Sequence, residues 1–69
     1  MTAQQIKKIR KSLGLTQVQM AKVLGISQRE ITRYEKGDNG ISRVAARLLN
    51  LLHVKPELVE TCKQLAEAD

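Results

Sequence analysis

Three short segments in the first 31 residues share one helix-start pattern, which constrains the fold more than any other feature of the chain. They are Thr2-Ala3-Gln4-Gln5, Thr16-Gln17-Val18-Gln19 and Ser27-Gln28-Arg29-Glu30. Each fits a capping box, in which a Ser or Thr side chain and a Glu or Gln side chain three residues later satisfy each other's backbone amides. Apolar pairs that can form hydrophobic staples flank the boxes: Met1 with Ile6, Leu15 with Met20, and Ile26 with Ile31. The pattern predicts three helices in close succession.

The expected helix ends agree with these starts. Gly14, Gly25 and Gly37 lie where a helix needs a left-handed residue after its last turn, so helices are predicted over 3–13, 17–24 and 28–36. Ser42 is expected to cap a fourth helix over 43–53. Pro56 is placed like a first-turn proline, which predicts a fifth helix over 56–66. No strand pattern, repeat or long linker competes, so the prediction is a single all-α domain over residues 1–69.

Apolar spacing predicts which helix faces form the core. The first helix offers Ile6, Ile9 and Leu13, and the third offers only Ile31 and Tyr34. The other expected core positions are Val18 and Ala21, with Met20 and Leu24 less certain, in the second helix, and Val44, Leu48, Leu51 and Leu52 in the fourth. Because the third helix has so thin an apolar stripe, most of its surface should face solvent or a partner.

Charge is unevenly distributed along the 69 residues. Residues 1–55 carry a net charge of +8, and residues 56–69 carry −3. A basic body favours a polyanionic partner, although many basic domains bind none. No apolar run approaches the roughly 20 residues needed to cross a bilayer, so no membrane partner is expected. The single cysteine, Cys62, suits a reducing compartment, and a cytoplasmic, nucleoid-associated location is predicted.

The second and third predicted helices are joined by only Gly25-Ile26-Ser27, a spacing typical of a helix-turn-helix. The stretch LTQVQMAKVLGISQREITRYEKG resembles the helix-turn-helix of the Cro/C1 repressor (XRE) family. Thr16-Gln17, Ala21, Gly25, Ile31 and the closing Tyr34-Glu35-Lys36-Gly37 carry this resemblance. It covers about residues 3–55 and implies a five-helix, lambda-repressor-like domain that binds near-palindromic double-stranded DNA as a homodimer.

The third helix is expected to contact the DNA bases. With Ile31 and Tyr34 turned to the core, the outward positions include Gln28, Arg29, Thr32 and Arg33. Arginine can bind guanine O6 and N7 in a bidentate manner, and glutamine can bind adenine. Thr32 could offer its methyl group to thymine or its hydroxyl to a base. The alternative is that Arg29 and Arg33 are solubilising charges, or that Arg33 pairs with Glu30.

A second set of residues is predicted to bind DNA phosphates. The amides and positive dipole end of a helix N-terminus favour anions. The candidates are Thr16, Gln17, Lys36, Asn39, Ser42 and Arg43. The resemblance favours Gln17 and Arg43, whereas capping is the alternative role for these helix-start residues. Asp38 puts the contact of its loop in doubt, because an acidic side chain repels phosphate.

Other roles follow from the resemblance or remain open. The resemblance implies that Arg10 and Glu35 form a structural ion pair. An apolar stripe with Leu58, Val59, Cys62 and Leu65 predicts a dimerisation surface, the alternative being packing within one chain. The chain also resembles the DNA-binding half of MqsA-type antitoxins, without their cysteine clusters, so a protein partner such as a toxin or coregulator stays an alternative. No catalytic, metal-binding or cofactor pattern is present, and an enzyme is not expected.

Overall fold

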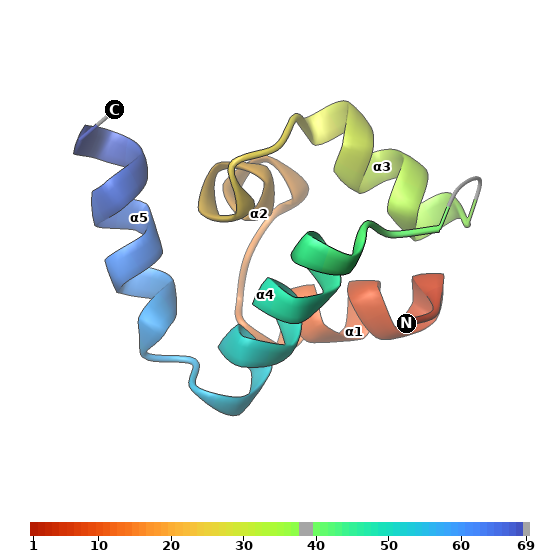
Figure 1. Cartoon of the computed structure of the whole chain (residues 1–69), viewed down its shortest axis with the longest axis horizontal. Coiled ribbons are helices and arrows are strands. Elements are labelled where there is room, and N and C mark those ends of the chain that lie inside the picture. The colour runs from red at the N-terminus through yellow and green to blue at the C-terminus, as the bar shows by residue number, and fades with distance from the viewer. Residues whose placement is uncertain (38–39, 69) are drawn as a thin grey trace.

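The computed structural model describes residues 1–37 and 40–68 and contains five helices (Figure 1). They are α1 (Ala3–Ser12), α2 (Gln17–Leu24), α3 (Gln28–Lys36), α4 (Arg43–Val54) and α5 (Leu58–Ala68). The described part of the chain has no strand. The predicted all-α class is therefore confirmed, and the ends of the first four helices lie within one residue of their predicted positions.

Side-chain caps explain why the first three helices begin where they do. Thr2 and Thr16 form complete capping boxes with Gln5 and Gln19. Ser27 accepts from the backbone amide of Glu30 at 3.2 Å, but the Glu30 carboxylate instead accepts from the Tyr34 hydroxyl at 3.4 Å. The third box predicted from the sequence is therefore only half formed, because Glu30 bonds to Tyr34 one turn further along α3 instead of to the backbone amide of Ser27.

The predicted start of the last helix is wrong by two residues. Pro56 and Glu57 form a turn ahead of α5, in which the Leu58 amide donates to the Lys55 carbonyl at 3.1 Å and the Val59 amide to the Pro56 carbonyl at 3.0 Å. These bonds span three residues rather than the four of an α-helix. Pro56 therefore shapes the approach to α5 instead of occupying its first turn.

The helices pack around one aliphatic core. α3 lies against both α1 and α2, while α5 packs mainly on α2 and lies apart from α3 (Figure 1). The buried residues are Ile6, Ile9, Leu15, Met20, Ala21, Val23, Ile31, Tyr34, Ala45, Leu49, Leu52 and Val59. α2 thus contacts α3, α4 and α5, and α3 has one side in the core and one side outside it.

Two of the predicted core faces need correction. Val18 is 45% exposed, and Met20, Ala21 and Val23 form the inner side of α2 instead. Val44 is 80% exposed and Leu51 is 48% exposed. In α4 the buried residues are Ala45, Leu49 and Leu52, and Leu48 is half-buried. α4 carries apolar residues on several sides, so spacing alone does not determine which side turns inward.

The described helices give no candidate for a membrane span, since none combines sufficient length with sufficient apolar character.

Candidate nucleic-acid interface

A three-residue turn places α3 directly after α2. Gly25 adopts a left-handed conformation with φ of 74°, and the Ile26 amide donates to the Ala21 carbonyl at 3.0 Å. Glycine reaches this conformation without the steric cost that a side chain would add. Ser27 then caps α3 at once. The buried Ala21 supplies only a small side chain where the two helices meet. The local sequence thus determines the sharp change of direction between α2 and α3.

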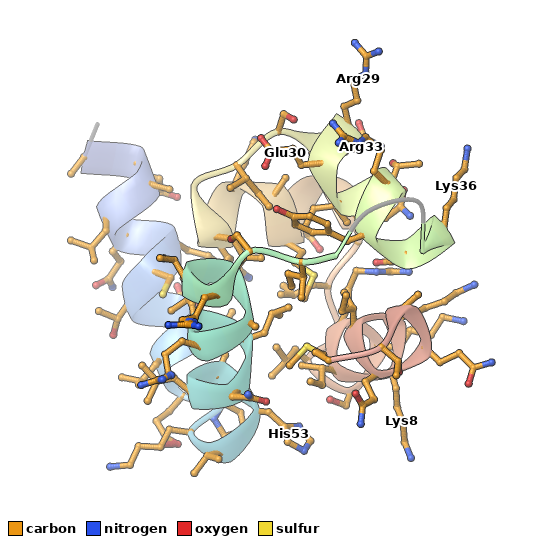
Figure 2. The ribbon with its side chains drawn as sticks, turned by 45° about the vertical axis from the view of Figure 1, so that its right-hand side comes forward. Lys8, Arg29, Glu30, Arg33, Lys36 and His53 are labelled. Atoms are coloured by element: carbon orange, nitrogen blue, oxygen red, sulfur yellow. The ribbon has the colours of Figure 1, made fainter. Side chains whose placement is uncertain are left out.

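α3 has a buried side and a charged outer side. Ile31 is fully buried and Tyr34 is 9% exposed, whereas Gln28, Arg29, Arg33 and Lys36 are exposed. In Figure 2, Arg29 and Lys36 extend away from the body of the molecule near the two ends of α3, and Arg33 lies between them. The structure therefore brings together, on one helix face, three of the four predicted base-contacting residues.

An ion pair anchors the C-terminal half of α3 to α1. The Arg10 guanidinium donates to Glu35 through Nε to Oε2 at 2.7 Å and through Nη2 to Oε1 at 3.1 Å. Arg10 Nη1 also donates to the Leu15 carbonyl at 3.0 Å. The two side chains are 12% and 5% exposed, respectively. The pair that the resemblance implied is present, and its guanidinium is turned inward.

The Glu35 carboxylate stays ionised because its partners outweigh its burial. Burial alone raises the pKa of Glu35. Hydrogen bonds from Arg10 and Gln17 and the positive charges of Arg10 and Lys7 lower it by more, so the pKa lies below its ordinary value of 4.5. Glu35 is therefore a fixed negative charge that Arg10 compensates.

Gln17 and Thr32 make contacts that the sequence did not reveal. Gln17 Nε2 donates to Glu35 Oε1 at 3.3 Å, and Thr32 Oγ1 lies 3.4 Å from Gln17 Oε1 and 3.0 Å from the Gln28 carbonyl. The Thr32 hydroxyl is thus occupied within the protein, which leaves its methyl group for the predicted base contact. The residues involved are 15 and 18 positions apart, and no local pattern signals such a pairing.

The predicted phosphate-binding residues lie at three helix ends. Thr16 caps α2 and Ser42 caps α4, so both side-chain oxygens have backbone partners. Lys36 ends α3 and Arg43 begins α4, and both are exposed. Asn39 lies outside the described residues. The capping role weighed as an alternative for Thr16 and Ser42 is therefore present, and any contact with phosphate would be additional to it.

The four predicted dimerisation residues of α5 differ in burial. Leu65 is 63% exposed, Leu58 and Cys62 are half-buried, and Val59 is 9% exposed and belongs to the core. Leu65 and Cys62 line a groove between α5 and α2 together with Val23, Leu24 and Leu48. Three further apolar residues, Val44, Leu51 and Val54, are exposed on α4. Residues 1–37 and 40–68 contain no group of His, Cys, Asp or Glu that could hold a metal ion.

Comparisons with known proteins agree with this geometry. The profile of the helix-turn-helix family matches residues 6–59, which include most of α1 and all of α2, α3 and α4. The antitoxin PezA of Streptococcus pneumoniae serotype 4 is 38% identical over 52 residues, which are 75% of this chain and 31% of PezA. The chain thus spans about a third of the length of that curated relative. No solved structure matched the chain significantly. The α2–turn–α3 geometry and the family match together show that the chain belongs to the helix-turn-helix family, in its Cro/C1 (XRE) type.

Proposed function

We propose that the protein is a sequence-specific regulator of transcription, a repressor or autoregulator without enzymatic activity that works on double-stranded DNA in the cytoplasm. The observation that carries this proposal is the outer side of α3, where Gln28, Arg29 and Arg33 are exposed together while Ile31 and Tyr34 hold the opposite side in the core. A helix presented in this way fits the major groove, where each base pair offers a distinct pattern of donors and acceptors.

The other exposed positive charges are placed to contact the DNA backbone and so to position the protein on it. Lys36 and Arg43 lie at the end of α3 and the start of α4, and the N-terminus of α2 adds unpaired backbone amides. Contacts to phosphates orient a protein on the duplex without selecting sequence. In this mechanism α3 selects the bases. The N-termini of α2 and α4 bind phosphates and thereby hold α3 in register with the bases.

The experiment that tests this function selects bound duplexes from a random DNA pool. The wild type is compared with the double variant Arg29→Ala/Arg33→Ala and with the control Lys8→Ala/Lys11→Ala. Both doubles remove two positive charges, but the control residues are exposed on α1, and Lys8 points away from α3 (Figure 2). The wild type and the control should select one near-palindromic consensus, and Arg29→Ala/Arg33→Ala should lose it.

Other results would point elsewhere. Recovery of unrelated duplexes by all three proteins would show binding driven by charge alone and would contradict sequence-specific regulation. Loss of the consensus in the Lys8→Ala/Lys11→Ala control as well would show that net charge, rather than the face of α3, determines selection. Thermal unfolding of each variant separates these results from a loss of folding.

We also propose that the protein binds DNA as a homodimer through the exposed part of α5. Support comes from Leu65, which is largely exposed beside the groove that Cys62, Val23 and Leu48 line. Exposed apolar surface next to a groove is typical of interaction sites. A dimer of this fold class places its recognition helices about 34 Å apart, which predicts half-sites one turn of the double helix apart.

A second candidate function is the DNA-binding part of an antitoxin, with a toxin as protein partner. The similarity to antitoxin PezA favours it. The outer side of α3 is polar and charged, which suits DNA better than a protein, so a toxin would have to bind elsewhere. Co-expression with the product of the adjacent gene, followed by co-purification, tests this candidate. Recovery of the chain without any stoichiometric partner would contradict it.

A further inference from the structure

We propose that Gln17 is a positioning residue that determines which bases α3 prefers, rather than a simple phosphate ligand. The inference rests on the proposed function as a DNA-binding regulator and deepens it. Gln17 is the first residue of α2, but both polar atoms of its side chain are directed to α3. Its Nε2 donates to Glu35 Oε1 at 3.3 Å, and its Oε1 accepts from Thr32 Oγ1 at 3.4 Å.

The two hydrogen bonds of Gln17 link α2 to α3, and the end of this link at Glu35 is rigid. Glu35 Oε1, the atom that Gln17 contacts, also accepts from Arg10 Nη2 at 3.1 Å, and Glu35 Oε2 accepts from Arg10 Nε at 2.7 Å. Arg10 is bonded in turn to the Leu15 carbonyl, just before α2. A bidentate contact between arginine and a carboxylate fixes both groups in one plane. Gln17 is therefore held by an ion pair that joins α1, α3 and the start of α2.

The other end of the link reaches the base-contacting face. Thr32 and Gln28 are one helical turn apart and are both predicted to face bases. The Thr32 hydroxyl carries one hydrogen but has two acceptors within reach, the Gln28 carbonyl at 3.0 Å and Gln17 Oε1 at 3.4 Å. When the Thr32 hydroxyl donates to Gln17, it connects this part of α3 to α2. When it donates to the Gln28 carbonyl, that connection is absent. Gln17 thereby biases where Thr32 and Gln28 meet the DNA.

The chemistry of the link distinguishes it from a phosphate contact. Glu35 is ionised and can only accept, so Gln17 must present its amide nitrogen there and its oxygen to Thr32. This orientation directs the side chain into the protein. Loss of a neutral phosphate contact weakens binding to all sequences alike. Loss of a link that orients α3 changes the relative affinities of different sequences.

The test measures relative affinities over a panel of duplexes, each differing at one base pair from the sequence that the wild type selects. Gln17→Ala is compared with Arg43→Ala, which represents a phosphate contact, and with Thr32→Val, which keeps the size and the methyl group of threonine. Gln17→Ala should change the preference at one or two base positions by about fivefold. Arg43→Ala should weaken all duplexes equally and reduce the dependence of log Kd on log salt concentration by about one unit.

The combination of the two variants gives the decisive result. Gln17→Ala/Thr32→Val should alter base preference no more than either single variant, because both single changes break the same link. A uniform loss of affinity in Gln17→Ala, parallel to that of Arg43→Ala, would overturn the inference and leave the proposed function intact. Additive effects of the two changes would also overturn it. Absence of any wild-type preference would overturn both proposals. Thermal unfolding of the variants verifies that each is folded.

Discussion

At the scale of single residues, one carboxylate connects stability to the proposed DNA-binding face. Glu35 is on the helix that we expect to contact bases, but it serves the interior, where Arg10 and Gln17 hold it. Buried ion pairs contribute little net stability because desolvation offsets their attraction, whereas removal of one partner leaves an uncompensated charge. The pair therefore fixes the placement of α3 more than it adds to the free energy of unfolding.

The lowered pKa of Glu35 predicts a loss of stability in acid. A carboxylate whose pKa is lower in the folded state than in the unfolded chain stabilises the fold fully above the unfolded value, which is about 4.3–4.5. This contribution is lost as the pH falls through the lower, folded pKa. Urea unfolding from pH 7 down to about pH 3 should show the decline in the wild type, and Glu35→Gln should lack that component.

The matched control for this pH series is Glu60→Gln, since Glu60 is an exposed carboxylate on α5. It should retain the acid-dependent decline of the wild type. An equal pH dependence in Glu35→Gln and the wild type would show that Glu35 does not contribute to it.

A second residue-scale prediction concerns Arg33. Arg33→Ala should cost about 1–3 kcal/mol of binding free energy at one base position and relax specificity there. Arg33→Lys keeps the charge but not the planar fork that binds guanine in a bidentate manner, so it should lose the same discrimination while keeping the salt dependence. Competition between duplexes that differ at single base pairs measures both. An equal weakening on every duplex would show that Arg33 contacts phosphate instead.

At the scale of helices, the sequence predicted where each helix begins and ends better than it predicted which side of the helix is buried. The starts at Thr2, Thr16 and Ser27 depend on side chains that bond within three residues, so they can be recognised locally. The inward side of α4 depends on which neighbours it meets, and Val44 and Leu51 were therefore misplaced. The same limit explains why the outer row of α3 could be anticipated, whereas the contact of Gln17 with α3 could not.

The turn between α2 and α3 supplies a prediction at this scale. Gly25→Ala should lower the free energy of unfolding by about 1–2 kcal/mol, the cost of a left-handed conformation for a residue with a side chain. A Cβ at Gly25 would meet no atom within 4 Å, so backbone strain alone causes the loss. Gly40→Ala is the matched control, because Gly40 has open space and no positive φ. Urea unfolding compares the two, and equal stabilities would contradict the strain argument.

At the scale of the whole molecule, the groove beside α5 and the outer side of α3 lie on different elements, so substitutions can test the proposed dimerisation and the proposed base recognition separately. Figure 1 shows α5 on the far side of α2 from α1 and apart from α3. α5 also carries Glu60 and Glu67, whereas α3 and α1 carry most of the exposed basic residues. This division keeps the acidic side chains of α5 away from the proposed DNA surface.

The proposed dimer surface gives the last prediction. Leu65→Lys should weaken self-association by about tenfold or more, because a charge would replace an apolar side chain at the contact. Binding to a single half-site should be unchanged, and binding to two half-sites should fall. Sedimentation velocity measures self-association, and titration with a one-half-site duplex and a two-half-site duplex measures DNA binding. Val54→Lys is the control, because Val54 is an apolar residue on α4 that is 75% exposed; greater disruption by this control would place the interface on α4.

The separation of the two sides of α3 also affects how such a protein can evolve. Ile31, Tyr34 and Glu35 carry the packing of the helix, and Arg29 and Arg33 contribute nothing to the buried core. Under the proposed function, substitutions at positions 29 and 33 should change the preferred operator at little expense in stability. After duplication of its gene, a descendant could acquire a new target site by single steps, each of them passing through a folded protein.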